Sequence, residues 1–510
     1  MERFIVSPVP VRRSLVALIA SASVLIALPA GAAAVCTFDD PTATVTIAMA
    51  DGDDTVVSRL GDAIAVDGVA CDIATVTNTD LIVVTSTGTP ASLRIDLAGG
   101  AFAPGETAET DAADSEIEWQ ITLPPTANLR ILGTPASDNL VIGTSGINLN
   151  GAEAAGDTDV VVTGTPSLFL IGLDGNDVLS VGGGSGTGTP GPIATLLGGA
   201  AGDLFLPGAI GSTFDGSDGP DAIDYSSLAG PIDADLQAGT VDVGAGTDLL
   251  IAVENLTATP GDDIVTGDGG PNLLHGGPGN DHIAGGAGDD TLDGGVGTDL
   301  LDLSAAAAAA VDLSGDLATG DGTDTIAAFE DVLGSPGDDV LVGDNEANAI
   351  DGDTGDDEIN GGLGADDLTG GAGTDTVSFV AAPDGVTVDL RDDTATGAGT
   401  DVLAGFENVD GSGRADVIHG DDSVNVLNGR TGADKVYGHD GADRLLGDSA
   451  ADLLFGQSGN DVLLGGANHD QLNGGEGNDD VCRGGQGPDS FVFCENHPAS
   501  TSGLVVFERS

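Results

Sequence analysis

Aspartates recur at nine-residue intervals between residues 258 and 481. Each closes a glycine-rich segment, as in GGAGDDTLD at 285–293, and an aliphatic residue follows two positions later, from Val265 to Val481. The acidic positions are Asp263, Asp281, Asp290, Asp299, Asp339, Asp357, Asp366, Asp375, Asp416, Asp434, Asp443, Asp452, Asp461, Asp470 and Asp479, with Asn272, Asn348 and Asn425 in the second unit of each run. Carboxylates in such number can hold a hard cation, because hard cations prefer oxygen ligands.

The elements that position these carboxylates are predicted to be the half-coils of a parallel β-solenoid. The glycine-rich half of each unit permits the positive torsions of a tight turn, and the other half is a minimal strand with one inward aliphatic side chain. Two units close a coil, and coils stack about 4.8 Å apart. The fold class is therefore an all-β β-roll of nonapeptide repeats, preceded by an irregular all-β, solenoid-like N-terminal region.

Stacking the coils places the aspartates in columns along each turn edge. Two carboxylates about 5 Å apart repel by about 0.8 kcal/mol in water and by about 3 kcal/mol at an effective dielectric of 20. Calcium removes this repulsion by binding carboxylates and turn carbonyls. A metal-free solenoid, in which Asp-Gly and Asn-Asp pairs only favour turns, is the alternative, but it leaves the columns unneutralised. An EF-hand is excluded because no stretch has its ligand spacing.

The sequence GGxGxD, followed by x, an aliphatic residue and x, resembles the repeats-in-toxin, or haemolysin-type, calcium-binding family. The resemblance implies that each calcium ion lies between same-side turns and joins, for example, Asp263 with Asp281 or Asp339 with Asp357. Runs of five, five and eight units then imply about twelve ions. Asparagine-containing units are expected to bind weakly or to cap a run. The whole chain also resembles a group of exported bacterial calcium-binding proteins.

Charge restricts the partners. The 510-residue chain has 83 acidic and 13 basic side chains, and its net charge of -70 repels nucleic acids and anionic membranes. The expected partners are calcium ions and a cell-surface glycan or protein, without membrane insertion. Glycine contributes 83 residues and aromatics only 3%, which predicts a thin aliphatic core.

Residues 1–34 have the pattern of a signal peptide. Basic residues precede the apolar stretch Leu15–Leu28, and Ala32-Ala33-Ala34 provides a cleavage site before Val35. The apolar stretch is shorter than the roughly 20 residues of a membrane-spanning helix. The pair Arg12-Arg13 leaves both general and twin-arginine export open. A secreted protein, released or attached non-covalently to the cell surface, is expected.

Four cysteines suit an oxidising compartment. Their positions favour the pairs Cys36 with Cys71 and Cys482 with Cys494, the second capping the last coil. A zinc site is the alternative, but the close paired spacing of zinc ribbons is missing.

A longer repeat of about 77 residues includes the connectors between runs. Asp235-Leu236, Asp312-Leu313 and Asp389-Leu390 align, as do the GTD triplets at 246, 322 and 399 and the glutamates Glu254, Glu330 and Glu407. The predicted map is a signal peptide at 1–34, an irregular region at 35–215, connector-plus-run modules at 216–302, 303–378 and 379–494, and a tail at 495–510. Connectors are expected to resemble β-hairpins, with Ala305–Ala310 as a loop. Degenerate repeat units end at Asp177, Asp203 and Asp221.

No catalytic motif is found. HExxH and GxSxG are absent, and His275, His282, His419, His439, His469 and His497 are scattered without a partner cluster. The chain is therefore predicted not to be an enzyme. Two other hypotheses stay open: a calcium-dependent adhesin or surface component, and a solenoid polysaccharide lyase or hydrolase with its site in residues 35–215.

Overall fold

The computed structural model describes residues 34–50, 53–77, 79, 81–86, 92–99, 117–143, 146–149, 159–164, 166–183, 192–208, 211–244, 246–494 and the backbone of 506–507. The signal peptide predicted at 1–34, apart from Ala34, lies outside these residues, as do His497 and most of the tail. The chain forms two compact units, Met1–Gly261 and Asp262–Ser510. Among the described residues, no helix is long and apolar enough to cross a membrane.

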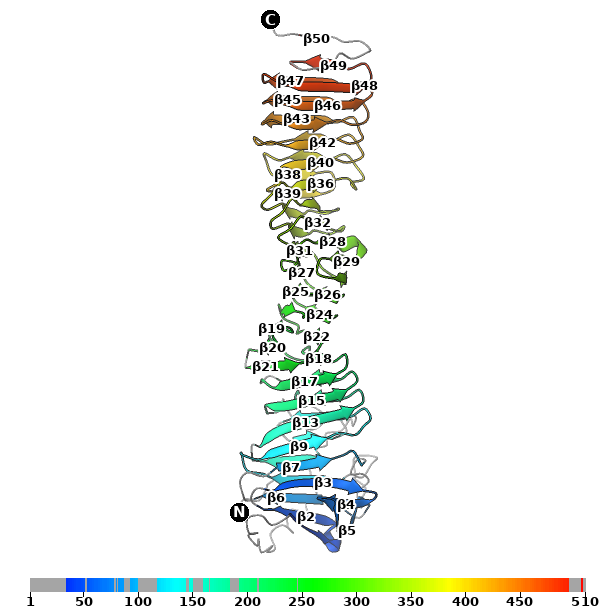
Figure 1. Ribbon diagram of the computed structural model, residues 1–510, viewed down its shortest axis with the longest axis vertical. Helices are drawn as coiled ribbons and strands as arrows, with labels where there is room; N and C mark the ends of the chain where they lie inside the picture. The colour runs from blue at the N-terminus through cyan, green and yellow to red at the C-terminus, as the bar shows by residue number, and fades with distance from the viewer. Residues whose placement is uncertain are drawn as a thin grey trace. The chain divides into compact units, whose positions relative to one another are not determined.

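The described strands of the first unit form two sheets, and the chain passes repeatedly from one to the other (Figure 1). One sheet has the spatial order β1 (Val35–Asp39), β2 (Thr44–Met49), β6 (Leu81–Ser86), β8 (Glu118–Thr122), β12 (Val160–Thr163), β11 (Gly146–Asn148), β10 (Asn139–Gly143), β14 (Val178–Ser180), β16 (Leu204–Leu206), β18 (Ala222–Asp224) and β22 (Asn255–Thr257).

The other sheet of this unit has the order β5 (Val69–Thr75), β4 (Ala63–Val66), β3 (Asp54–Leu60), β7 (Ser92–Asp96), β9 (Asn128–Leu132), β13 (Ser167–Asp174), β15 (Ala194–Ala200), β17 (Thr213–Asp218), β21 (Thr247–Ile251), β20 (Thr240–Asp242) and β19 (Asp233–Asp235). A short 3-10 helix, η1 (Asp40–Thr42), joins β1 to β2.

Coils of the first unit become smaller along the chain. Ile82 pairs in parallel with Val45 and Trp119, which lie 37 residues before and after it, whereas Phe205 pairs with Ile223 only 18 residues later. The wide coils have room for large side chains, so Trp119 is completely buried. The thin aliphatic core predicted from composition is therefore wrong for this region, because the few aromatics are concentrated there: Trp119, Tyr225, Phe205 and Phe214 are its largest buried side chains.

Antiparallel strands close the N-terminal end of this unit. β1 covers the outer edge of β2, and β4 and β5 cover that of β3. The predicted disulfide between Cys36 and Cys71 is present and links β1 to β5. Both sheets therefore begin with a covered edge, which protects against pairing with another chain.

The second unit is the regular β-solenoid. One sheet has the order β24 (Leu273–Pro278), β26 (Thr291–Val296), β30 (Thr323–Ala327), β29 (Leu317–Thr319), β28 (Ala310–Asp312), β32 (Val340–Val342), β34 (Glu358–Asn360), β36 (Thr376–Ser378), β40 (Asn408–Asp410), β42 (Val426–Asn428), β44 (Arg444–Leu446), β46 (Val462–Ala467) and β48 (Val481–Gln486).

Its second sheet has the order β23 (Ile264–Thr266), β25 (His282–Ala284), β27 (Leu300–Asp302), β31 (Asp331–Leu333), β33 (Ala349–Asp351), β35 (Asp367–Thr369), β39 (Thr400–Ala404), β38 (Thr394–Thr396), β37 (Thr387–Asp389), β41 (Val417–His419), β43 (Lys435–Asp440), β45 (Leu453–Ser458), β47 (Gln471–Glu476), β49 (Ser490–Val492) and β50 (Val506–Phe507). A 3-10 helix, η2 (Leu313–Gly315), follows β28.

The all-β solenoid predicted from the nine-residue period is confirmed. Strands 18 residues apart pair in parallel, as Val436 does with Ile418 and Leu454, and the inward aliphatic side chains are buried. Figure 1 shows the stacked strands of the last run in orange and red. Two nine-residue units therefore close each coil.

Connectors are three-stranded antiparallel meanders rather than simple hairpins. In the second connector, β28, β29 and β30 pair with one another in antiparallel order. At one side of this meander β30 pairs in parallel with β26 of the preceding run, and at the other side β28 pairs in parallel with β32 of the next run. The third connector, β37–β39, does the same in the opposite sheet. Ala305–Ala309 is the predicted loop, with Ala310 opening β28.

The sequence-based register is wrong at the last repeats. Val462 pairs with Val481 and Leu463 with Cys482, 19 residues apart, so one residue is inserted before β48. As a result Asp479 is exposed, and Asp480 and Cys482 take the buried positions assigned to Asp479 and Val481. Counting nine residues from Asp470 selects the first of two adjacent aspartates and misses the insertion.

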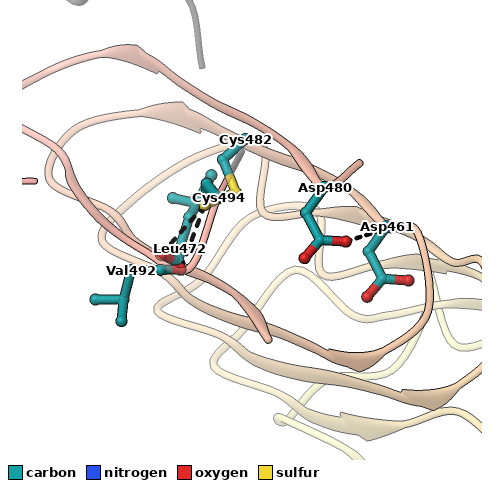
Figure 2. Close-up of a disulfide and its surroundings, with 6 residues drawn as sticks. All are labelled: Asp461, Leu472, Asp480, Cys482, Val492 and Cys494. Atoms are coloured by element: carbon teal, nitrogen blue, oxygen red, sulfur yellow. Dashed lines mark hydrogen bonds between the residues drawn. A yellow bond between two sulfur atoms is a disulfide. The ribbon is translucent and has the colours of Figure 1, made fainter. Parts of the chain in front are cut away.

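The predicted Cys482–Cys494 disulfide is present, and Figure 2 shows it beside Leu472 and Val492 in the last coil. Cys482 occupies an inward position of β48, and Cys494 follows β49. The bond therefore fastens β48 to the segment that directly follows β49.

Candidate metal centres

The repeat aspartates form hydrogen-bonded ladders inside the turns. In each stacked pair, Oδ1 of one aspartate accepts a hydrogen bond from the backbone N–H of the aspartate one coil earlier, at 2.8 Å between Asp263 N and Asp281 and 3.0 Å between Asp434 N and Asp452. The same contact joins Asp281 to Asp299, Asp339 to Asp357, Asp357 to Asp375, Asp416 to Asp434, Asp443 to Asp461 and Asp452 to Asp470. These side chains are buried rather than lying on the turn edge.

Connectors continue the ladders with residues that the nine-residue count does not include. Asp324 and Asp401, from the GTD triplets, accept from the N–H groups of Asp290 and Asp366. Glu330 and Glu407 accept from those of Asp299 and Asp375. The aligned triplets and glutamates signalled a shared role, but only the fold shows that this role is to replace a repeat aspartate.

The first unit has a shorter ladder. Asp138, Asp177 and Asp203 donate their N–H groups to the side chains of Asp177, Asp203 and Asp221 in turn. Glu254 accepts from Asp221 at the end of this series. The degenerate units recognised in the sequence therefore have the same turn architecture as the regular runs.

The second carboxylate oxygen is the chemically active feature. In most turns Oδ2 is buried and has no hydrogen-bond partner, and this holds for Asp177, Asp203, Asp221, Asp281, Asp290, Asp299, Asp357, Asp375, Asp434, Asp443, Asp452, Asp461, Asp470 and Asp489. Burying a polar oxygen without a partner costs roughly 1–3 kcal/mol. So many orphaned oxygens of one kind indicate that something positively charged completes them.

Burial also shifts the titration of these groups. Burial, and to a smaller extent the neighbouring carboxylates, raise the pKa of Asp434, Asp443 and Asp452 to about 7 against the opposing effect of the backbone hydrogen bonds. Burial and the adjacent carboxylates likewise raise the pKa of Asp281 and Asp357 to about 6. The ladder therefore resists carrying its full negative charge in the absence of a cation.

Glycine leaves room for an ion beside each orphaned oxygen. A β-carbon built on Gly447 would lie 2.6 Å from Oδ2 of Asp452 and 2.8 Å from the carbonyl oxygen of Gly465 in the next coil. The first glycine of the unit therefore keeps open a small space lined by a carboxylate oxygen and a main-chain carbonyl. This donor set suits calcium, which accepts oxygen ligands in flexible geometry.

Side chains alone do not form these centres. Across the part of the chain that the structure describes, no three His, Cys, Asp or Glu side chains converge as a metal cluster. A cation bound beside Oδ2 of Asp452 would also have the main-chain carbonyl of Gly465 within reach as a ligand.

The structure brings fourteen of the fifteen repeat aspartates, all except Asp479, into the buried ladder positions. Their binding of metal stays a prediction. The sequence count missed Asp480, which accepts from Asp461 N at 2.9 Å, and Asp489, which accepts from Asp470 N at 3.2 Å. Asp489 lies two residues before the buried Phe491, which is the spacing of the other repeat aspartates, so the pattern indicates it once the inserted residue is allowed for. Figure 2 shows the contact between Asp461 and Asp480.

The prediction that the histidines lack a partner cluster is wrong for His419 and His439. His275 and His282 each lie beside one aspartate, at 3.1 Å from Asp293 and 2.6 Å from Asp302. His419 Nδ1 lies 3.0 Å from His439 Nε2, and the His419 ring stacks on Tyr437. Arg391 donates to His439 Nδ1, so His439 carries its proton on Nε2 and donates to His419. Burial and Arg391 lower the pKa of His439. The group is an outward-facing stack of rings from adjacent coils.

Comparison with known protein families agrees with this geometry. The description "RTX calcium-binding nonapeptide repeat (4 copies)" matches residues 169–187 and 266–301, and overlapping matches cover 330–377 and 403–491. A search of curated proteins found no match to the chain. The matched segments contain most of the turns with buried, orphaned carboxylate oxygens, and these segments are thus RTX calcium-binding nonapeptide repeats of the haemolysin-type family.

Proposed function

We propose that this protein is exported and that its repeat runs fold as they bind extracellular calcium at the ladder aspartates. The observation that carries the proposal is the series of buried Oδ2 atoms without a partner, each beside a glycine-lined space. Calcium bound there would supply both the missing partner and the opposite charge. Because the unfolded chain lacks these spaces, binding energy becomes folding energy.

Charge supports the same coupling. With a net charge of -70, the chain before export repels itself and resists collapse, and calcium outside the cell reverses that balance. The two disulfides fit the oxidising environment that an exported protein meets. Export itself rests on the basic, apolar and small-residue pattern of residues 1–34.

Metal analysis after equilibrium dialysis of residues 35–510 tests the binding. We expect several calcium ions per chain, about twelve by the family's pairing rule, and we expect equimolar magnesium not to displace them because Mg²⁺ demands a compact octahedral shell. The double variant Asp452→Asn/Asp461→Asn should bind fewer ions. Asp392→Asn/Asp393→Asn, which removes the same charge from exposed positions, should bind as many as the wild type. An equal loss of bound calcium in both double variants would show that net charge, rather than the ladder positions, determines the binding.

A further inference from the structure

Turns of the ladder fall into two classes that differ in the residue four positions before the acid. In closed turns the N–H of that residue donates to the side-chain oxygen that would otherwise be orphaned. Ser335 N donates to Asp339 at 2.6 Å and Ser412 N to Asp416 at 2.7 Å. The same bond runs from Thr134 to Asp138, Asp268 to Asn272, Asp344 to Asn348 and Asp421 to Asn425.

In open turns the residue at this position has a positive φ. It is Asp448, with φ 62°, before Asp452, and Gln457, with φ 73°, before Asp461. Positive φ also occurs at Leu173, Gly199, Ser217, Gly277, Gly286, Gly295, Asp353, Gly371, Arg430, His439, Gly466 and Gly485, each four residues before an aspartate whose Oδ2 has no partner. None of the six donors in the closed turns is among the positive-φ residues of the described chain.

The two features exclude each other for a conformational reason. A positive φ turns the preceding peptide plane, so its N–H no longer faces the carboxylate. Non-glycine residues accept this conformation at a cost of roughly 1–2 kcal/mol each. Strain that recurs at Arg430, His439, Asp448 and Gln457 indicates a functional requirement at that position.

We propose that this backbone choice assigns the metal sites: open turns bind calcium, and the closed turns that begin each run do not. This inference rests on the function proposed above. It adds sites at Asp203 and Asp221 in the first unit, which lie outside the residues that the family description matches. It also removes the site expected between Asp339 and Asp357, because the turn of Asp339 is closed.

The first-unit sites have the features of the regular ones. The side chains of Asp203 and Asp221 are 2% and 0% exposed, and their Oδ2 atoms have no partner. A β-carbon on Gly216 would meet both Oδ2 of Asp221 and the carbonyl oxygen of Ala252. The same carboxylate and carbonyl donors thus face one space as in the long third run.

Closed turns have their own means of joining a connector to a run. Asn348 Nδ2 donates to the carbonyl oxygen of Glu330 at 2.9 Å, and Asn425 Nδ2 to that of Glu407 at 2.8 Å. An aspartate has no proton to donate there, which explains asparagine in the second unit of these runs. The amide takes the place of a cation, so these joints form without metal.

Calcium counting on residues 35–510 tests the first-unit sites. Asp203→Asn/Asp221→Asn should lose bound calcium relative to the wild type and should lose the calcium-dependent protection of residues 198–224 in hydrogen exchange. Asp138→Asn, in a closed turn of the same unit, is the matched control and should lose neither. If the double variant keeps its calcium, or if Asp138→Asn loses as much, the inference is wrong.

A gain-of-site variant tests the closed turns. Ser335→Gly/Ser412→Gly removes both serine hydroxyl contacts to the aspartates and permits a positive φ at these positions. Bound calcium should rise above the wild-type number, whereas Ser423→Gly, which leaves the donor Asp421 in place, should leave it unchanged. No gain in the double variant overturns the inference, while a wild-type chain that binds no calcium overturns the proposed function itself.

Discussion

The widest coils of the first unit and the long third run stack parallel strands in the same way but stabilise them differently. Around β2, β6 and β8 each coil has about twice the residues of a repeat coil, and large side chains such as Trp119 fill it. From β41 to β47 each strand buries one inward aliphatic residue, and the carboxylate ladder runs alongside. Apolar burial holds the first region, whereas the second needs its charges neutralised.

The comparison predicts that only one of the two regions responds to calcium. Fully burying a large apolar side chain contributes about 1.5–3 kcal/mol without any ion. A repeat coil buries only two such side chains, so little favourable free energy of folding is left once its buried carboxylates are charged. We therefore expect a bound ligand to determine the folded population of the repeat runs.

The largest expected effect is that of pH on the metal-free protein, because many ladder carboxyls titrate together. Their folded pKa values, about 7 for Asp434, Asp443 and Asp452, lie above the ordinary 3.8. The folded state therefore binds protons more tightly, and its stability is highest below about pH 4 and is lost as pH rises through 7. In chelator, circular dichroism should show more β-structure at pH 5 than at pH 8.

Excess calcium should reverse this trend, because protons compete with the ion for the same oxygens. Sedimentation at each pH controls for association near the isoelectric point of about 4.1. A metal-free protein that gains structure between pH 5 and pH 8 would argue against a buried, uncompensated ladder.

Replacing Trp119 by alanine should destabilise the first unit by about 3–5 kcal/mol, the usual cost of emptying a large aromatic site. Urea unfolding followed in chelator and in calcium should give the same loss, because no ladder contact is involved. Leu60→Ala, at an exposed position of β3, should change little. If calcium restored the stability that Trp119→Ala removes, the first region would also depend on the ion, and the difference between the two regions would be refuted.

The disulfides sharpen the comparison at the chain ends. Replacing Cys482 by valine and Cys494 by alanine should cost about 3 kcal/mol and removing Cys36–Cys71 about 4 kcal/mol, from the lengths of the loops they close. Hydrogen exchange should place the first loss in β48 and β49 and the second in β1–β5. Losses spread over a whole unit would contradict local capping.

The smallest predicted change concerns backbone strain in an open turn. Gln457→Gly should stabilise the third run by about 1 kcal/mol, because glycine adopts a positive φ without strain. Gln471→Gly, in strand β47, is the control and should destabilise by about 0.5–1 kcal/mol. Thermal unfolding in calcium compares the two variants, and equal destabilisation would show that the φ of residue 457 is not strained.

The regular part of the fold could be predicted because one pattern repeats. Inward aliphatic residues such as Leu454 at every ninth position require stacked half-coils. Asp452, two residues earlier, must then lie in the turn before the strand. Asp479 was misassigned because a single inserted residue does not disturb composition or local spacing. It becomes visible only when Cys482 must point inward.

Other features depend on contacts that distant residues make. The wide core around Trp119 comes from pairing across 37-residue coils, which has no short period in the sequence. The role of Asn348 depends on the carbonyl of Glu330 one coil away. The division into open and closed turns depends on φ at Ser335 or Asp448, which residue type alone does not fix.

Far-ultraviolet circular dichroism of residues 35–510 during a calcium titration tests the central claim most directly. From chelator to about 10 mM calcium, a range that includes extracellular affinities, the account predicts a partial β-signal from the first unit that rises as the runs fold. A spectrum that stays fully β-structured and does not change across the titration would contradict calcium-driven folding of the repeat runs.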